Sequence, residues 1–388
     1  MSFDRHTQTV DVAVVGGGVI GLAVAWRART LGLSVVLLER AKLAAAASHV
    51  AAGMLAPVSE VEFGEAGRRL LKLGLASAER WSGWAARLAE ASGQTLGVRM
   101  SGTLVVARDR DEAEALEREI VLRDALGLRT RRLRGSQARE LEPALAPTVR
   151  LALEAPDDHS VDPRLVCAAL ATAAERAGAR LREGVRVERL LIDDRARRVE
   201  GVLLADGEQL RAGRVVLAAG AWSADLDPPH ESRSHVRPVK GQILRLRDPA
   251  GPGLLERVLR FADGYLVPRA DGGYVLGATV EERGFDTTVT VGGVLELLRE
   301  AQELIPGLSE LVIEEMDAGL RPGSPDNLPS IGASSLEGLV WATGHFRNGI
   351  LLAPLTADLV GDVLCDRPPD PLADLCRPER GLATQVGA

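Results

Sequence analysis

The residues with the clearest chemical role are three glycines near the start of the chain. Gly16, Gly18 and Gly21 form the pattern G-x-G-x-x-G. An apolar segment precedes the pattern and a helical pattern follows it, which is the context in which such glycines bind a diphosphate. Gly16 allows a tight turn, Gly18 lets the backbone approach the diphosphate, and Gly21 lets helix and strand pack closely. The spacing therefore predicts a dinucleotide-binding turn at the positive end of a helix.

Glu39 adds a second part to the same predicted site. It lies 18 residues after Gly21, at the end of the apolar segment 35–38. An acid at this place accepts hydrogen bonds from the hydroxyl groups of a ribose and repels a 2′-phosphate. The two features together disfavour NADP and leave NAD and FAD as candidates.

Three later segments distinguish these cofactors, because they resemble the flavin signatures of the D-amino-acid oxidase superfamily. They are Ser48–Leu55, Val215–Trp222 and Gly344–Ile350, and the resemblance covers the chain from about residue 10 to residue 365. It implies an FAD-binding fold in which the first segment passes beside the isoalloxazine ring. Members with covalent flavin carry a cysteine near the third signature. Segment 344–349 has none, so we expect non-covalent FAD.

Within this superfamily the chain is most similar to the glycine oxidase family of thiamine thiazole synthesis. Four stretches carry the likeness: Ala52–Leu55, Tyr265–Arg269, Gly319–Pro322 and Gly344–Gly349. The resemblance implies oxidative deamination of glycine and small amines such as sarcosine and small D-amino acids. The expected products are an oxo acid or aldehyde, ammonia or amine, and H2O2, with O2 as the electron acceptor. It also implies a homo-oligomer, a tetramer, and a supply of imine for thiazole synthesis.

The resemblance assigns the substrate-binding residues Arg321, Tyr265 and Met54. Oxidation at Cα needs an electron sink, which a flavin supplies, so neither a catalytic triad nor a metal site is expected. Arg321 corresponds to an arginine that binds the substrate carboxylate through two parallel hydrogen bonds. Tyr265 corresponds to a tyrosine that bonds the same carboxylate, and Met54 to an apolar wall above the ring. The expected cofactor contacts are Gly16, Gly18, Gly21, Glu39, Arg40, Ser48, Ala52, Gly53, Met54, Val187, Gly220, Trp222, His345, Arg347, Asn348, Gly349 and Ile350.

Two positions depart from the glycine oxidase pattern. Asp263 stands where that pattern has a histidine, and Val280 where it has a methionine. We expect Met54 and Val280 to form an apolar wall that suits small amino acids. His345 could be a base, but we expect it to be structural, because an amine can lose its proton to solvent.

Other functions of the same fold remain open. A sarcosine oxidase would share the layout, and so would a D-amino-acid dehydrogenase that passes electrons to a quinone or carrier. A tRNA-modifying FAD oxidase would need a basic surface, which the net charge of -7 disfavours. A flavin-binding protein without activity would not need Arg321 and Tyr265.

Composition places the chain among ordinary globular proteins. It has 388 residues, of which 46% are apolar and 26% charged. The three cysteines form no pair or cluster of metal-binding spacing, and we expect Cys365 at a buried helix position. The first ten residues contain no apolar run of signal-peptide length, and no stretch approaches a membrane span. We therefore expect a cytoplasmic protein that binds neither membrane nor nucleic acid.

The order of the elements predicts an α/β protein, α+β overall. Strand-like segments 10–15, 35–38 and 215–219 alternate with helical patterns, which predicts a parallel sheet with both faces covered. Asp162 and Pro163 suit the start of a helix, and Asp206-Gly207 suits a hairpin turn.

The pattern between residues 227 and 290 changes to short alternating segments, which predicts antiparallel strands. The parallel pattern resumes near 339–343. We expect a Rossmann-like FAD-binding domain with a parallel sheet, plus a substrate domain with an antiparallel sheet. The expected FAD-binding domain is 1–90, 150–225 and 315–366, the expected substrate domain is 91–149 and 226–314, and 367–388 is expected to be a poorly ordered tail.

Overall fold

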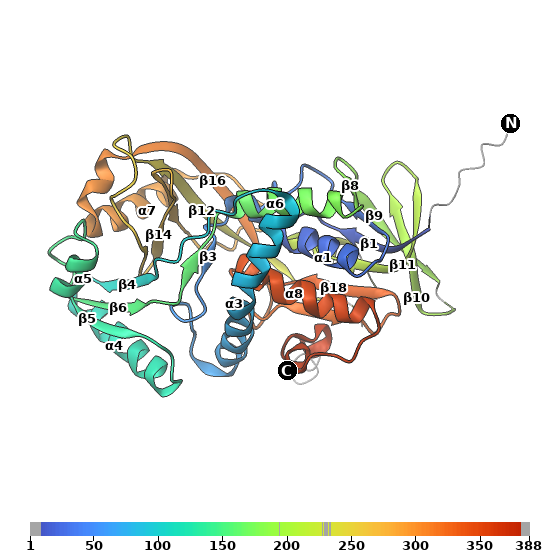
Figure 1. The fold of residues 1–388 in the computed structure, drawn as a ribbon, viewed down its shortest axis with the longest axis horizontal. Helices are drawn as coiled ribbons and strands as arrows, with labels where there is room; N and C mark the ends of the chain where they lie inside the picture. The colour runs from blue at the N-terminus through green and yellow to red at the C-terminus, as the bar shows by residue number, and fades with distance from the viewer. Residues whose placement is uncertain (1–8, 194, 227, 229–231, 233, 382–388) are drawn as a thin grey trace.

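Two eight-stranded sheets organise the computed structural model, which describes residues 9–193, 195–226, 228, 232 and 234–381. The first sheet lies at the end of the molecule where Figure 1 labels β9 and β10, and the second lies at the opposite end. The long strands β12 (Arg237–Arg247) and β16 (Val312–Gly323) run between them.

The first sheet is parallel at its centre. Its path runs β17-β18-β11-β1-β2-β8, and β1 pairs in parallel with both β2 and β11. The hairpin β9–β10 adds two antiparallel strands beside β11. The strands are β1 (Thr9–Val15), β2 (Val35–Leu38), β8 (Arg180–Arg182), β9 (Val187–Asp193), β10 (Arg198–Leu204), β11 (Gln209–Leu217), β17 (Ser330–Ala333) and β18 (Leu339–Thr343).

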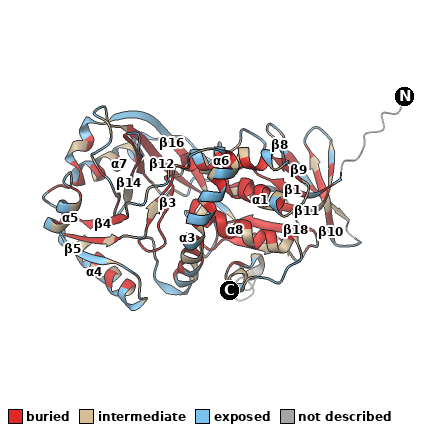
Figure 2. Ribbon diagram, in the orientation of Figure 1, coloured by how far each residue is buried: buried red, intermediate tan, exposed pale blue. Residues whose placement is uncertain are grey.

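Four helices belong to this half. They are α1 (Val19–Thr30), α3 (Gly64–Ser92), α6 (Pro163–Arg176) and α8 (Gly349–Leu364). Helix α1 packs against α6 and α8, and most of its side chains are buried (Figure 2). The Asp162 carboxylate caps α6, as predicted, by accepting hydrogen bonds from the backbone of Arg164 and Leu165.

The second sheet is mainly antiparallel, and its order is β16-β12-β15-β14-β13-β4-β6-β5. Helices α4, α5 and α7 lie on this half of the molecule (Figure 1). The short helix α2 (Ala47–Val50) and the strand pair β3 (Met54–Leu55) and β7 (His159–Ser160) stand outside both sheets. The remaining elements are β4 (Thr103–Ala107), α4 (Arg110–Ala125), β5 (Arg131–Arg134), α5 (Gly135–Leu141), β6 (Leu151–Ala155), β13 (Val258–Phe261), β14 (Gly264–Pro268), β15 (Gly273–Gly277) and α7 (Val291–Leu304).

The fold class expected from the sequence is confirmed, with a parallel α/β sheet and a mainly antiparallel second sheet. Strand β16 pairs with β12 along its whole length, so it belongs to the second sheet. The expected boundary at 315 falls inside this strand. The change between sheets lies between Gly323 and Ser330, and the division into domains stays a prediction.

Two expectations about the C-terminal region are wrong. Residues 371–381 are ordered, because they form two short 3₁₀ helices beside β17. Cys376, in the first of them, is buried in the core of the first half. Cys365 is not a buried helix residue, because it follows the last residue of α8 and is partly exposed. Residues 1–8 and 382–388, which the expected domains and tail include, lie outside the described residues.

Candidate functional site

A cavity of about 590 Å³ brings the glycine-rich turn and the second sheet together. Its wall begins at the turn after β1, passes α2 and the segment before β3, and reaches β12, β14 and β16. The carboxyl ends of β1 and β11 open toward it, which is where open parallel sheets bind ligands.

The glycine-rich turn has the geometry that its spacing predicts. A side chain on Gly16 would bring its Cβ within 2.4 Å of the Ala218 carbonyl oxygen, and the φ angle of Gly16 is +110°. A Cβ on Gly21 would lie 1.9 Å from the Gly16 carbonyl oxygen. Gly18 faces the cavity, where a Cβ would meet only the Ser48 hydroxyl at 3.3 Å. The turn is therefore closed on its protein side and open toward a ligand.

Glu39 lines the cavity beside this turn. Its carboxylate accepts hydrogen bonds from the backbone N–H of Gly17, at 2.7 Å, and of Ala41, at 2.9 Å. The carboxylate therefore fixes the turn, and its position matches that expected of a ribose-binding acid. The Ser48 hydroxyl similarly accepts from the Val19 N–H at the start of α1, at 3.0 Å.

Most residues predicted to bind the cofactor lie around this one cavity. Two do not line it: Gly21 packs under the turn, and Asn348 precedes the first residue of α8. The predicted contacts that line it are Gly16, Gly18, Glu39, Arg40, Ser48, Ala52, Gly53, Met54, Val187, Gly220, Trp222, His345, Arg347, Gly349 and Ile350.

Trp222 forms part of a small aromatic cluster at the cavity wall. The Arg40 guanidinium lies 4.0 Å from the centre of the Trp222 ring. Phe285, from the segment after β15, stacks on Trp222 with ring centres 5.6 Å apart. Phe285 was not predicted as a site residue, because it has no local motif.

Arg321 points into the cavity from β16. Its Nη1 donates hydrogen bonds to the backbone carbonyl groups of Thr279, at 3.0 Å, and Lys240, at 3.3 Å. A Cβ on Gly241 would lie 2.3 Å from the guanidinium nitrogens, so this glycine leaves the space that Arg321 occupies. Burial lowers the pKa of Arg321. Among the described residues Arg321 forms no ion pair, which leaves its charge available to an anion.

Tyr265 lies beside Arg321 on the cavity wall. It belongs to β14, and its neighbour Leu266 is fully buried on the other face of the sheet, as strand alternation predicts. A Cβ on Gly277 would lie 2.6 Å from the Tyr265 hydroxyl, so the absence of a side chain there makes room for the ring. Burial raises the pKa of the Tyr265 hydroxyl, which keeps it a donor.

Arg347 and Glu60 form a charged pair at the same wall. The Arg347 Nη2 lies 2.7 Å from the Glu60 Oε1, and Arg260 lies 3.7 Å from the same oxygen. Burial alone would raise the pKa of Glu60, but Arg347 and Arg260 outweigh it and hold that pKa below its usual value. Glu60 was missed by the sequence analysis, since a lone acid between two unrelated segments carries no signal.

The apolar wall differs from the expectation. Met54 lines the cavity and packs against the small core that also contacts Tyr265. Val280 does not, and its side chain is 63% exposed. Thr279 and Glu281 point toward Gln242, so alternation turns Val280 to solvent. The prediction that Val280 forms the pocket wall is therefore wrong.

His345 is a packed residue. It is buried, its Nε2 lies 2.9 Å from the Thr356 hydroxyl, and burial lowers its pKa to about 3. The imidazole is therefore neutral near pH 7.

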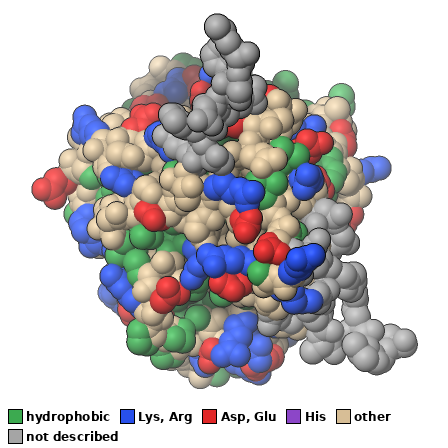
Figure 3. All heavy atoms as spheres, turned by 90° about the vertical axis from the view of Figure 1, so that its right-hand side faces the viewer, with side chains coloured by type: hydrophobic (Ala, Val, Ile, Leu, Met, Phe, Trp, Pro, Cys, Tyr) green, Lys and Arg blue, Asp and Glu red, His purple; other side chains and the backbone are tan. Residues whose placement is uncertain are grey.

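Other kinds of site were also sought. Within the described part of the chain, no group of three or more His, Cys, Asp or Glu side chains could hold a metal ion. No described helix is both long and apolar enough to cross a membrane. On the face at the first-sheet end, basic and acidic side chains are interspersed (Figure 3).

The cavity fits the expected FAD. Gly18 offers a backbone surface that a Cβ would obstruct, and the first turn of α1 presents its positive end there. The same wall includes Glu39 and Arg321, so it joins the acid expected to bind a ribose to a cation that has no ion-pair partner among the described residues. Such a continuous wall suits a dinucleotide bound next to a small anionic substrate.

Comparison with known proteins agrees with this geometry. The chain matches the family described as FAD dependent oxidoreductase over residues 11–363. Glycine oxidase of Geobacillus kaustophilus is 35% identical over 360 residues, which cover 92% of this chain and 93% of that protein. The crystal structure of glycine oxidase from Geobacillus kaustophilus superposes with a TM-score of 0.88 at 34% identity, covering 96% of this chain and 99% of that one.

Some relatives are longer than this chain. The bifunctional protein ThiO/ThiG of Synechocystis sp. is 38% identical over 381 residues, which cover 97% of this chain and 55% of that protein. The chain spans about half the length of three such bifunctional relatives. The match to the family covers most of the chain, and close relatives agree with it. The chain therefore belongs to the FAD dependent oxidoreductase family, and FAD is its cofactor.

Proposed function

We propose that the protein is a glycine oxidase that acts on glycine and small amines such as sarcosine and small D-amino acids. The observation that carries this proposal is the pairing of Arg321 with Tyr265 at one end of the FAD cavity. A partly buried arginine that forms no ion pair within the described part of the chain suits a carboxylate, since an unpaired charge in a site that excludes water is costly. The name glycine oxidase among relatives of similar length supports the same substrate class.

The residues at the cavity wall either bind the substrate or exclude water from it. Bound FAD supplies the acceptor for the two electrons that leave the substrate. Arg321 and the Tyr265 hydroxyl hold the carboxylate, and Met54 covers the apolar side of the substrate. Glycine is oxidised to its imine, water hydrolyses the imine to an oxo acid and ammonia, and O2 is reduced to H2O2. Burial lowers the pKa of His345 to about 3 and its Nε2 contacts Thr356, so it is a weak base, which supports loss of the substrate amine's proton to solvent.

The wider setting is part of this proposal. The names of the bifunctional relatives support a supply of imine to thiamine thiazole synthesis. We also propose a homotetramer in the cytoplasm that binds neither nucleic acid nor membrane, from the resemblance to glycine oxidase and the net charge of -7.

An aerobic substrate panel tests the proposal. Glycine, sarcosine, N-ethylglycine, D-alanine and D-proline are compared by the rate of peroxide release. We expect glycine or sarcosine to be oxidised fastest. Preference for D-arginine or D-glutamate would contradict the small pocket, and turnover only with an artificial acceptor would indicate a dehydrogenase. A gel-shift assay with tRNA should show no binding.

A further inference from the structure

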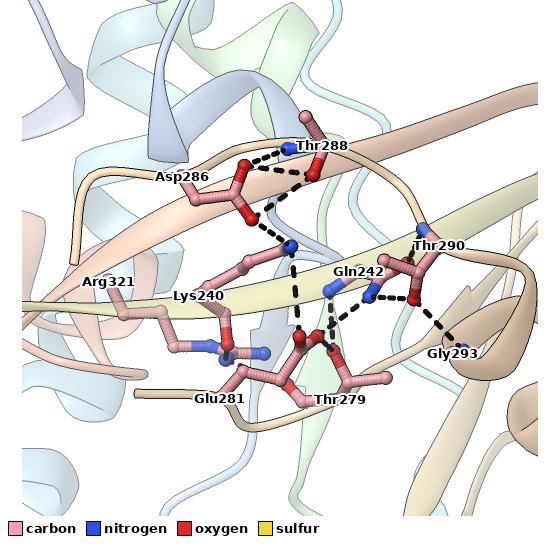
Figure 4. Close-up of polar contacts among 9 residues, drawn as sticks. All are labelled: Lys240, Gln242, Thr279, Glu281, Asp286, Thr288, Thr290, Gly293 and Arg321. Atoms are coloured by element: carbon pink, nitrogen blue, oxygen red, sulfur yellow. Dashed lines mark hydrogen bonds and ion pairs between the residues drawn. The ribbon is translucent and has the colours of Figure 1, made fainter. Parts of the chain in front are cut away.

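Lys240 is a charged side chain that points away from the FAD cavity and yet is 1% exposed. It lies on β12, next to Gly241. Its Nζ is 2.8 Å from the Asp286 Oδ2 and 3.7 Å from the Glu281 Oε2 (Figure 4). A buried ammonium group is costly without such partners, so its position needs an explanation.

Both carboxylates belong to one segment, residues 279–290, which connects β15 to α7 and which we call the strap. Gln242 holds its two ends. The Gln242 Nε2 donates to the Glu281 carboxylate at 2.7 Å, and the Gln242 Oε1 accepts from the Thr290 N–H at 2.8 Å. Lys240 holds its middle through Asp286, whose pKa falls to about 2 because of this hydrogen bond.

The strap reaches the cavity directly at one residue and indirectly through Phe285, which is 49% exposed and does not itself line the cavity. Thr287 lines the cavity, and Phe285 stacks on Trp222, which also lines it. At its start, the Thr279 carbonyl accepts a hydrogen bond from Arg321 (Figure 4). The Lys240 carbonyl accepts from the same guanidinium, so backbone groups of two segments, the strap and β12, orient the cation. The strap thus links the Trp222 wall to the arginine.

We propose that Lys240 is a positioning residue that fixes the strap, so that Phe285 supports the Trp222 wall of the cavity and Arg321 is held toward the substrate. The second half of this inference rests on the proposed carboxylate-binding role of Arg321. The Lys240 side chain touches neither the cavity nor the substrate, and it acts only through the strap.

The test compares Lys240→Met with the wild type. The dissociation constant of FAD is measured by titrating apoprotein and following flavin fluorescence. Acetate binding is measured on the holoprotein through the flavin absorbance change, and KM and kcat are measured with glycine. We expect the dissociation constants of FAD and acetate, and KM, to rise about 5- to 30-fold, less than after loss of a charge that touches the ligand, because Lys240 acts on both ligands through the strap. The kcat at saturating glycine should change less than KM.

Three further variants separate the parts of the argument. Lys240→Arg keeps the charge and should restore most of the binding. Phe285→Ala should weaken FAD binding and leave acetate binding near the wild-type value. Glu282→Gln is the matched control, because Glu282 lies on the strap, is exposed and pairs with Arg237 instead. It should change neither dissociation constant.

The outcomes decide the inference in each case. FAD and acetate constants within twofold of the wild type in folded Lys240→Met would overturn it. If that variant does not fold, Asp286→Asn removes the same ion pair from its exposed side, and unchanged constants there would overturn it equally. A wild type that binds acetate but does not oxidise glycine would refute the proposed function alone, since the binding measurements do not depend on turnover.

Discussion

Replacing Arg321 by alanine is the sharpest test of how the site binds its substrate. The guanidinium lies at the cavity wall and forms no ion pair with any of the described residues. Without this guanidinium, the carboxylate of the bound substrate would keep its negative charge in a site with little water. Removing one partner of such a pair costs about 2–5 kcal/mol. At about 1.4 kcal/mol per factor of ten, kcat/KM should fall roughly 30- to 4000-fold.

The structure also predicts which measured quantities the substitution should leave unchanged. Arg321 comes from β16 of the second sheet, whereas the glycine-rich turn belongs to the first, and two backbone carbonyl groups hold the guanidinium. FAD content and the flavin absorbance spectrum should therefore stay near the wild-type values. Arg321→Lys should recover part of the activity, because it restores charge without the two parallel donors. Arg299→Ala is a suitable control, since Arg299 lies on α7 and is 63% exposed.

Peroxide release with glycine and sarcosine measures the effect, and an amine without a carboxylate provides the internal comparison. That amine should be nearly indifferent to the substitution. Near-normal kcat/KM of Arg321→Ala for glycine or sarcosine would refute the assignment. Arg347 would then be the next candidate, although its ion pair with Glu60 already satisfies its charge.

Three further predictions concern the cofactor and the buried histidine. Gly18→Val should abolish FAD retention and Glu39→Ala should weaken it, measured by flavin absorbance after gel filtration; full occupancy in both would place the diphosphate elsewhere. Acid or heat denaturation should release all flavin into the supernatant, and flavin that stays with the precipitate would disprove non-covalent binding. Burial lowers the pKa of His345 to about 3 from 6.5, so the unfolded state binds more protons between these values and stability must fall as the pH falls. Between pH 7 and pH 5 the free energy of unfolding of the wild type, measured by urea denaturation, should drop about 2 kcal/mol more than that of His345→Gln. An equal pH dependence of the two free energies would show that the imidazole is not buried in its neutral form.

Local patterns predicted much of the fold, because strands and helices depend on neighbours in the chain. The segment 35–38 forms a strand with the expected bounds, and the expected short antiparallel strands between residues 227 and 290 include β13 and β14. The cap at Asp162 is equally local, since the carboxylate bonds backbone groups two and three residues away. The membership of β16 in the second sheet was not predictable in this way, because it depends on pairing with β12 far away in the sequence.

The functional site also has parts that local sequence patterns predict and parts that depend on distant segments. The glycine spacing and Glu39 determined the dinucleotide turn, because that turn is built within one β-α-β unit whose geometry follows from chain connectivity. The resemblance located Arg321 and Tyr265, but the residues that hold them in place carry no motif. Gly241 makes room for Arg321 and Glu60 neutralises Arg347, and each does so only where distant strands and turns meet.

Lys240 shows most clearly what the tertiary structure alone decided. In the sequence it is one of 47 Lys and Arg residues, and a lysine is by default exposed to solvent. In the folded chain the strap covers it and supplies two carboxylates from residues 281 and 286. The sequence by itself determined the cofactor turn and the class of fold, because short-range geometry and hydrophobic pattern are sufficient for both. Which charges are buried together, and therefore which of them are available to a substrate, depends on close approach between distant segments and was decided only by packing.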